Sequence, residues 1–205
     1  PIVIESAVKD IINILRSILP ASISIGASFE SNMQTVLASH IDLQQIVMNL
    51  CINARDAMQP GGKLSLRLSD YKPSQRFQLK FTSSKNKPLL RLQISDTGGG
   101  IPLEDLDKIF DPFFTTKERG RGTGLGLASA YGIIKNHDGI ITAQSEKGKG
   151  TTFTIYLPAS DKPVSEAEIA PEVQLSGAGT ILLIDDEEMI FERKSVAWGM
   201  SVGRW

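Results

Sequence analysis

The strongest constraint on the fold of this chain is a long glycine-rich stretch, residues 95–124, which shows neither strand alternation nor sustained helical spacing. Only a short part of it, near Leu103 to Ile109, has helical periodicity. A loop of about thirty residues inside a compact domain is usually functional or mobile. The segments on either side must therefore supply the packed framework that holds it.

Three segments have the apolar spacing of helices that bury one face. The first ends at Pro20, the second runs from Asp42, which we expect to be its N-cap, to Met58, and the third stops at Gly139. Their apolar positions are Val8, Ile11, Ile12, Leu15, Ile18 and Leu19 in the first helix, Leu43, Ile46, Val47, Leu50, Ala54 and Ala57 in the second, and Leu127, Ala130, Tyr131 and Ile134 in the third.

Five further segments alternate apolar with polar or small residues, as strands with one buried face do. Residues 72–87 are polar and indicate a hairpin or loop insertion. Because hairpins make the sheet mixed, we predict an α/β (α+β) two-layer sandwich in which a mixed sheet packs against three helices. The expected strands are residues 22–29, 64–69, 90–95, 140–143 and 152–157, the last two forming a hairpin around Gly148 to Gly150.

Length and composition allow one full globular domain with some remainder. The 22 Lys and Arg against 23 Asp and Glu give a net charge of -1, which lacks the positive excess of nucleic-acid binders. The single cysteine, Cys51, cannot form an internal disulfide or a cysteine metal cluster. Without an apolar stretch of about 18 residues or a secretory leader, we expect no membrane contact and a cytoplasmic location.

Asn49 and Asn53 lie four residues apart on the second helix, so they share a face that borders the apolar stripe. Asparagine is a poor residue for a helix interior and gains nothing from burial unless it is paired. The pair is either two satisfied or solvated polar residues, or two side-chain oxygens at a pocket edge. The second arrangement would suit a hydrated magnesium ion and phosphates.

Asp96 follows an apolar strand directly and opens the run Asp-Thr-Gly-Gly-Gly-Ile-Pro. A carboxylate in this position can accept a hydrogen bond from an exocyclic amine, and glycines let the backbone approach a flat ring. The alternative is a simple glycine turn.

The run Gly-Thr-Gly-Leu-Gly-Leu, residues 122–127, opens the third helix. Glycines at a helix N-terminus expose amide N–H groups to an anion, and the helix dipole adds attraction. The run lacks the Gly-Lys-Ser/Thr ending of a P-loop, and no strand precedes its helix as in a dinucleotide fold.

The order of these motifs resembles the catalytic ATP-binding domain of sensor histidine kinases, with the Bergerat ATP-binding fold. An asparagine-rich helix, a D-x-G-x-G turn, the phenylalanine segment 110–114 and the G-T-G-L-G-L run follow one another at the family's spacing. Gly148-x-Gly150-Thr151 before the last strand also matches. The resemblance covers residues 1–158.

The resemblance implies ATP and Mg2+ as cofactors and a role for each matched residue. Asn53 would coordinate the metal, Asn49 would contact the phosphates or the metal shell, and both would be catalytic. The adenine would be read by Asp96, and residues 100–122 would be the mobile ATP lid. The other implied nucleotide contacts are Gly98, Gly100 and Ile101 near the ring, Gly122, Thr123, Gly124, Leu125, Gly126 and Leu127 around the phosphates, and Thr151.

The sequence does not identify which cationic side chain would contact the phosphates. Many relatives have a lysine three residues after the metal-binding asparagine, whereas this chain has Asp56 there, with Arg55 beside it. We regard Lys117 and Arg121 in the lid as further candidates. Phe110, Phe113 and Phe114 either anchor the lid or form a plain core cluster.

The phosphoacceptor in these kinases is a histidine on a separate helical domain, so that domain and a downstream response regulator receiver are the implied partners. Neither histidine here has the acceptor context: we expect His40 in a loop and His137 as a charge partner at a helix end. Residues 180–188 resemble the start of a receiver domain. We therefore expect a linker at 159–178 and a truncated receiver start with a non-family tail at 179–205.

The predicted function is binding of Mg-ATP and donation of its γ-phosphoryl group to a histidine on another domain in two-component signal transduction. One alternative is a non-catalytic nucleotide-binding or docking module. The other is a hydrolytic ATPase of the gyrase or chaperone type. Such enzymes use a glutamate as base where this chain has Asn49, which cannot serve as one.

Overall fold

The computed structural model describes residues 2–31, 35–74, 77, 88–117 and 122–160. Within these residues three helices alternate with strands in the order the sequence predicts. The helices are α1 (Ile4–Ile18), α2 (His40–Ala57) and α4 (Gly126–Asn136), and the strands are β1 (Ile2–Val3), β2 (Ile23–Glu30), β3 (Thr35–Val36), β4 (Gly62–Tyr71), β5 (Leu89–Asp96), β6 (Ile140–Glu146) and β7 (Gly150–Pro158).

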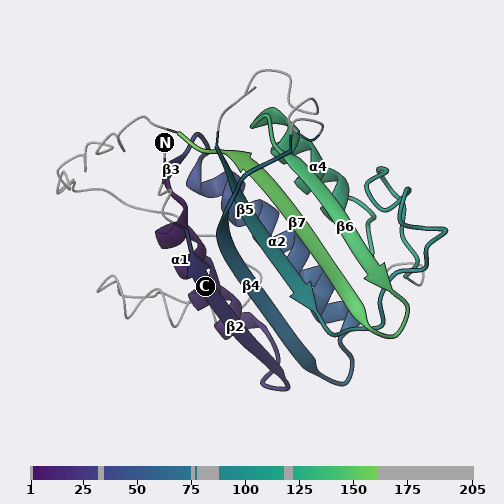
Figure 1. The fold of residues 1–205 in the computed structure, drawn as a ribbon. Coiled ribbons are helices and arrows are strands. Elements are labelled where there is room, and N and C mark those ends of the chain that lie inside the picture. Colours follow the sequence, from purple (N-terminus) through teal and green to yellow (C-terminus); the bar gives the residue numbers. More distant parts are fainter. Residues whose placement is uncertain (1, 32–34, 75–76, 78–87, 118–121, 161–205) are drawn as a thin grey trace, which may run out of the picture. The chain divides into compact units, whose positions relative to one another are not determined.

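The main sheet has five strands in the order β2-β4-β5-β7-β6. β2 and β4 run parallel, and every other neighbouring pair is antiparallel. The helices lie on one face of this sheet, with α2 behind its centre (Figure 1). The predicted two-layer sandwich with a mixed sheet and three helices is confirmed. A small second sheet pairs β1 with β3.

The core lies between the sheet and the helices. Helix α2 contacts both α1 and α4 and also packs on β5 and β7, so it forms the centre of the helical layer. Burying a side chain such as leucine or isoleucine contributes about 1.5–3 kcal/mol. The apolar stripes predicted from the sequence supply this core, including Val8, Ile11 and Leu15 of α1, Leu43, Ile46 and Leu50 of α2, and Ile134 of α4, each at most 2% exposed. Ile18, predicted in the stripe of the first helix, is instead 43% exposed at the end of α1.

The N-terminus of α2 differs from the expected one. Ser39, not Asp42, is the N-cap, since its Oγ accepts a hydrogen bond of 3.0 Å from the backbone N–H of Asp42. Asp42 instead stands in the first turn, where its Oδ2 lies 2.9 Å from Nε2 of His137. The hydrogen bonds with His137 and Ser39 lower the pKa of Asp42. The side chain of Asp42, which the sequence suggested as the cap, therefore makes a contact between α2 and α4 instead.

The two histidines have different surroundings. His137 is the C-cap residue of α4 and pairs with a carboxylate, as expected. His40 was expected in a loop, but it is the first residue of α2, and its Nε2 lies 3.7 Å from Oδ2 of Asp10. The cap at Ser39 starts the helix three residues earlier than a cap at Asp42 would allow.

The described part of the glycine-rich stretch is more firmly packed than its composition suggests. Residues 103–109, the short part with helical periodicity, form successive turns, with the N–H of Lys108 donating to the carbonyl of Asp105 at 2.8 Å. Ile109 is 5% exposed, and Ile101 and Leu106 also pack on the core. The phenylalanines are therefore not the only apolar anchors of this segment.

The three phenylalanines divide into two groups. Phe110 and Phe114 pack against the core, and the ring of Phe110 lies 5.4 Å from that of Tyr131. Phe113 is 74% exposed and has a positive φ of 68°, a backbone angle that few residues other than glycine adopt readily. Phe110 and Phe114 thus attach the segment to the core, whereas Phe113 points to solvent.

The two residues that follow β7, Ala159 and Ser160, still pack on the domain. Ala159 is 7% exposed and bridges to Val36, and the N–H of Ser160 donates to the carbonyl of Thr35 at 2.9 Å. Two residues of the segment assigned to a linker therefore pack against β3. The remainder of that linker, and residues 179–205, expected to be a receiver start with a non-family tail, lie outside the described residues.

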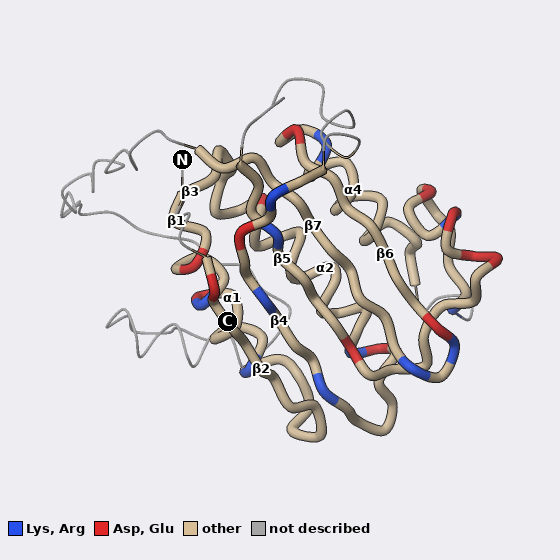
Figure 2. Tube along the Cα trace, in the orientation of Figure 1, with Lys and Arg blue, Asp and Glu red and all other residues tan. Residues whose placement is uncertain are grey.

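Charge is evenly distributed over the described chain. Figure 2 shows Lys and Arg interspersed with Asp and Glu, in keeping with the net charge of -1. Among the described helices, none combines the length and the apolar character needed to cross a bilayer.

Two isoleucines of α2 allow a matched test of the packing. Ile46 is 2% exposed and Ile41 is 75% exposed. Ile46→Ala should lower the free energy of unfolding by about 2–5 kcal/mol because it leaves a cavity beneath α2. Ile41→Ala should change it by no more than about 0.5 kcal/mol. Urea unfolding followed by circular dichroism measures both, and equal losses would contradict the orientation of α2.

Candidate functional site

Two adjoining cavities open between α2, the end of β5, the segment after it and the start of α4. The first, here named the Asp96 cavity, has a volume of about 320 Å³. The second, the glycine cavity, has a volume of about 400 Å³. Both are lined by Asn53, Asp56, Phe114, Thr115, Lys117 and Leu127. These shared residues join the cavities into one site.

The sequence-predicted residues divide between the two cavities. The Asp96 cavity adds Asp96, Gly100, Ile101 and Thr151, and the glycine cavity adds Asn49, Arg55, Gly122, Thr123, Gly124 and Gly126. Gly98 and Leu125 line neither cavity, and Arg121 lies outside the described residues. Most of the residues predicted for the site therefore line one of the two cavities.

Asp96 is the best-defined polar group of the site. It ends β5 and is 7% exposed. Its Oδ1 accepts hydrogen bonds from the backbone N–H groups of Gly98 at 2.8 Å and Thr151 at 3.3 Å. Burial raises the pKa of Asp96, and these two donors oppose that effect. The two bonds hold the carboxyl group in one orientation.

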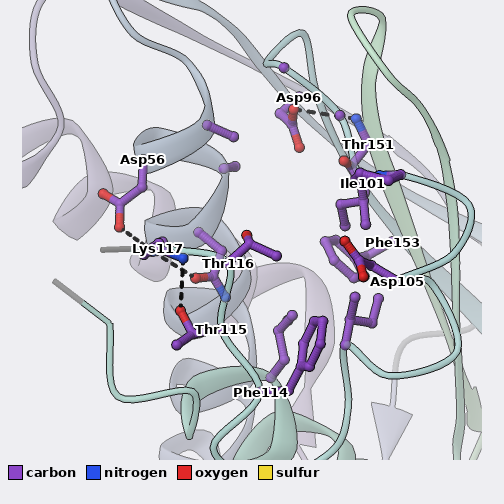
Figure 3. A pocket seen from close by; sticks show the side chains of 18 residues that line it. Asp56, Asp96, Ile101, Asp105, Phe114, Thr115, Thr116, Lys117, Thr151 and Phe153 are labelled. Atoms are coloured by element: carbon purple, nitrogen blue, oxygen red, sulfur yellow. Dashed lines mark hydrogen bonds and ion pairs between the residues drawn. The ribbon is translucent and has the colours of Figure 1, made fainter. Parts of the chain in front are cut away.

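The second oxygen of Asp96 is available to a ligand. Oδ2 has no hydrogen-bond partner within the described part of the chain. In the same residues no fully buried side-chain oxygen or nitrogen lacks a partner, so Oδ2 must reach the cavity. Figure 3 shows Asp96 beside Thr151 at one end of the site. A donor that enters this end would meet an oriented acceptor in a poorly hydrated position, where hydrogen bonds are strong.

The turn after Asp96 is held against the C-terminal end of α2. The N–H of Gly99 donates to the carbonyl of Ala57 at 3.0 Å. A Cβ on Gly98 would lie 2.6 Å from the same carbonyl oxygen. Gly98 therefore permits a close approach of the turn to α2 and does not line the cavity itself. This approach places Asp96 in the same site as Asn53.

Asn49 and Asn53 face the beginning of α4. A Cβ on Gly126 would lie 3.8 Å from Oδ1 of Asn49 and from Nδ2 of Asn53. Helix α4 has no acidic residue in its first turn, and its N-cap residue Leu125 provides no side-chain hydrogen bond. The first backbone N–H groups of a helix have no partner within the helix, and the dipole makes that end attractive to anions. The glycine cavity is therefore suited to phosphate groups.

One lysine projects into the site from the segment before residue 118. Nζ of Lys117 lies 2.6 Å from Oδ2 of Asp56 and 3.4 Å from Oδ1 of Asn53 (Figure 3). The guanidinium of Arg55 lies 2.8 Å from the other oxygen of Asp56. Partial burial works to raise the pKa of Asp56, but the bonds and charges of Lys117 and Arg55 outweigh it and lower the pKa.

Several lining residues were missed by the sequence reasoning. Asp56 follows Asn53 by three residues on α2, so helical spacing alone could have placed it in the site. Phe153 faces the cavity from β7, and its place in the alternating strand pattern was the available signal. Asp105, Thr115 and Thr116 had no such signal because they belong to the irregular segment.

A comparison with known protein families agrees with this geometry. Residues 38–161, more than half of the chain, match the family described as Histidine kinase-, DNA gyrase B-, and HSP90-like ATPase. The chain belongs to this ATPase family. Its matched region includes α2, the Asp96 turn and the start of α4, which are the elements that build the site.

Similar proteins within this family are sensor histidine kinases. The chain is 38% identical over 196 residues to the sensor kinase CckA of Brucella abortus (strain 2308), covering 91% of this chain and 21% of that protein. It is 34% identical over 173 residues to the sensory histidine kinase/phosphatase NtrB of Rhizobium leguminosarum bv. phaseoli, covering 83% of this chain and 44% of that protein. The chain thus spans less than half the length of either relative.

Solved structures share the fold. The catalytic domain of histidine kinase ThkA, in a nucleotide-free form, is 26% identical with a TM-score of 0.59, covering 76% of this chain and 91% of that chain. The mycobacterial sensor histidine kinase MprB is 23% identical with a TM-score of 0.61, covering 77% and 95%. The predicted histidine kinase catalytic domain and its Bergerat fold are confirmed.

Adjacent glycines of the Asp96 turn provide a matched test of its docking. Gly98→Ala should destabilise the protein by about 1–3 kcal/mol, because the new methyl group meets the carbonyl of Ala57. Gly99→Ala should be tolerated, since a Cβ there meets nothing closer than 4.0 Å. Thermal unfolding of both variants measures the difference. Equal stability would show that the turn is not tightly docked on α2.

Proposed function

We propose that this chain binds Mg-ATP and donates its γ-phosphoryl group to a histidine on a separate phosphoacceptor domain. The observation that carries the proposal is the joined site, with an oriented carboxylate at one end and an uncapped helix N-terminus at the other. The first feature suits a base with an amine and the second suits a chain of phosphates. Sensor histidine kinases among the relatives support the same reading.

The Asp96 cavity is the proposed adenine site. Oδ2 of Asp96 would accept a hydrogen bond from the exocyclic amine of adenine and would repel the carbonyl oxygen of guanine. Gly100, Ile101 and Thr151 line the same cavity, so they would surround the ring. Gly98 would act indirectly by holding the turn on α2.

The glycine cavity is the proposed phosphate site. Backbone N–H groups at Gly126 and Leu127 begin α4, and Gly122, Thr123 and Gly124 precede them along the cavity wall. Leu125 would contribute through its backbone, because the residue is 44% exposed and lines neither cavity. Arg121, which lies outside the described residues, stays a candidate for the cation that contacts the phosphates.

Magnesium fits the side chains present. In the described residues no three His, Cys, Asp or Glu side chains gather as a metal cage. Mg2+ commonly keeps several waters and takes only one or two protein oxygens together with substrate phosphates. Asn53 offers such an oxygen where the two cavities meet, and Asn49 lies one turn earlier. When bound, the ion would neutralise phosphate charge during transfer.

Phosphoryl transfer needs mainly positioning and neutralisation of charge, which this site can supply without a protein base. Asn49 cannot deprotonate a water molecule, which argues against a hydrolytic ATPase of the gyrase or chaperone type. A non-catalytic nucleotide-binding module is the remaining alternative. It differs in one testable respect, since it would bind ATP without passing phosphate to an acceptor.

The partners follow from the reaction. A phosphoacceptor histidine domain would receive the phosphoryl group, and a response regulator receiver would take it onward. Residues 180–188, which resemble a receiver start, would point to a hybrid kinase parent. ATP-dependent signalling of this type belongs in the cytoplasm, where we place this domain.

Adenine recognition gives the first prediction. Asp96→Asn keeps the shape and leaves one oxygen for the N–H groups of Gly98 and Thr151, but it turns an amide donor toward the adenine amine. ATP affinity should fall by about 1–3 kcal/mol, and the preference for ATP over GTP should shrink. Titration with fluorescent ATP and GTP analogues measures both, with Asp107→Asn at an exposed position as the charge control.

If Asp96→Asn bound ATP as tightly as the parent chain, the adenine site would have to lie elsewhere.

Phosphoryl transfer gives the second prediction. The chain alone, incubated with Mg-ATP labelled at the γ position, should stay unlabelled because neither His40 nor His137 lines either cavity. Adding a panel of phosphoacceptor hairpins should label a hairpin on histidine. Asn53→Ala should abolish this transfer and weaken Mg-dependent ATP binding, whereas Asn13→Ala on the exposed face of α1 should not.

ATP binding without label on any hairpin would favour the non-catalytic alternative. Acid-labile label on this chain by itself would contradict the need for a separate acceptor.

A further inference from the structure

Asp56 is an acidic residue in the part of the site that we assign to phosphates. A free carboxylate beside a triphosphate would weaken binding through charge repulsion. The carboxylate of Asp56 is not free, because Oδ2 contacts Lys117 at 2.6 Å and Oδ1 contacts Arg55 at 2.8 Å. Two cations and one carboxylate leave this group of three side chains with a net charge of +1.

The two cations differ in origin. Arg55 is the neighbour of Asp56 on α2, whereas Lys117 lies 61 residues further along the chain. The carboxylate therefore connects the last turn of α2 to the segment that leads to the glycine run. Among the described residues, Nζ of Lys117 has one other side-chain contact, with Oδ1 of Asn53 at 3.4 Å. Loss of the Asp56 carboxylate would leave only that longer contact to hold the ammonium group.

The position of Lys117 suits phosphate recognition. Its side chain is 34% exposed and lines both cavities. The backbone N–H of Lys117 donates to Oγ1 of Thr115 at 3.2 Å, which fixes where the side chain starts. A lysine ammonium has three N–H donors; Asp56 accepts from one at 2.6 Å, and Oδ1 of Asn53, the oxygen proposed for magnesium, accepts from a second only at 3.4 Å. One donor is left for a phosphate oxygen.

We propose that Asp56 is a positioning residue for phosphate recognition, which holds the ammonium group of Lys117 beside Asn53 before the nucleotide arrives. This inference rests on the proposed function, since it assigns the partner of the lysine as a nucleotide polyphosphate. A flexible lysine loses rotamer freedom when it binds a ligand, and an ion pair formed beforehand reduces that loss. Asp56 thus acts through Lys117 and makes no contact with the phosphates.

The inference predicts which part of the nucleotide each variant affects. Asp56→Asn should weaken binding of ATP about fivefold, the effect expected for a partly exposed ion pair. Adenosine has no phosphates to meet Lys117, so its affinity should stay unchanged. Asp56→Glu keeps the carboxylate and should restore ATP binding. Asp107→Asn, which removes an exposed carboxylate outside both cavities, is the control for net charge.

A double-substitution cycle tests whether Asp56 acts through the lysine. Lys117→Met should weaken ATP binding more than Asp56→Asn does. Because the carboxylate has nothing to position once the lysine is gone, adding Asp56→Asn to Lys117→Met should cause no further loss. Displacement of a fluorescent ATP analogue by ATP, ADP and adenosine, with magnesium present, gives all the required affinities.

Three results would overturn the inference while the proposed function stands. ATP affinity that is unchanged or higher in Asp56→Asn would show that the carboxylate only repels phosphates or has no role. Parallel loss of ATP and adenosine would indicate a general structural effect. Additive losses in the double variant would show that Asp56 acts independently of Lys117. Failure of the unsubstituted chain to bind any adenine nucleotide would overturn the inference and the proposed function together.

Discussion

The close approach between the Asp96 turn and the end of α2 is the contact on which the site depends. The N–H of Gly99 meets the carbonyl of Ala57, and the absence of a side chain at Gly98 makes the short distance possible. This contact brings the end of the sheet next to the last turns of the central helix. Asp96 from the sheet and Asn53 from the helix can then face the same ligand. A single methyl group at Gly98 would push the turn away from α2 and so move Asp96 away from Asn53.

Periodicity in the sequence determined the framework but not the details of its ends. The three helices and the five strands of the main sheet were predicted because each buries one face, which leaves a repeat of 3.6 or 2 in the apolar residues. The two-residue strands β1 and β3 were not predicted, since they are too short to show a repeat. The predicted start of α2 was wrong because serine and aspartate are both good N-cap residues. The contact of Asp42 with His137 on α4 leaves Ser39 as the cap. Such a contact joins residues 95 positions apart and leaves no local signal.

The site was predictable to a similar extent. Asp96, Asn53 and the glycine run were found because their motifs have a fixed order along the chain. The position of Lys117 against Asp56 was not, since it depends on the path of the irregular segment between the Asp96 turn and α4. The anchoring of that segment by Ile109 was also hidden, because one buried isoleucine among polar residues has no period. Residues that lie in loops are placed by packing, and packing is not visible in a local pattern.

The antiparallel register of β4 and β5 separates two ends of the sheet. Leu64 pairs with Asp96 at the site, while Tyr71 pairs with Leu89 at the opposite end. The chain between Tyr71 and Leu89 therefore leaves and re-enters the sheet far from the proposed nucleotide site. Changes of length in that connection can accumulate during evolution without disturbing that site. The same position is suited to a genetically inserted fluorescent reporter or affinity tag, which would leave the chemistry untouched.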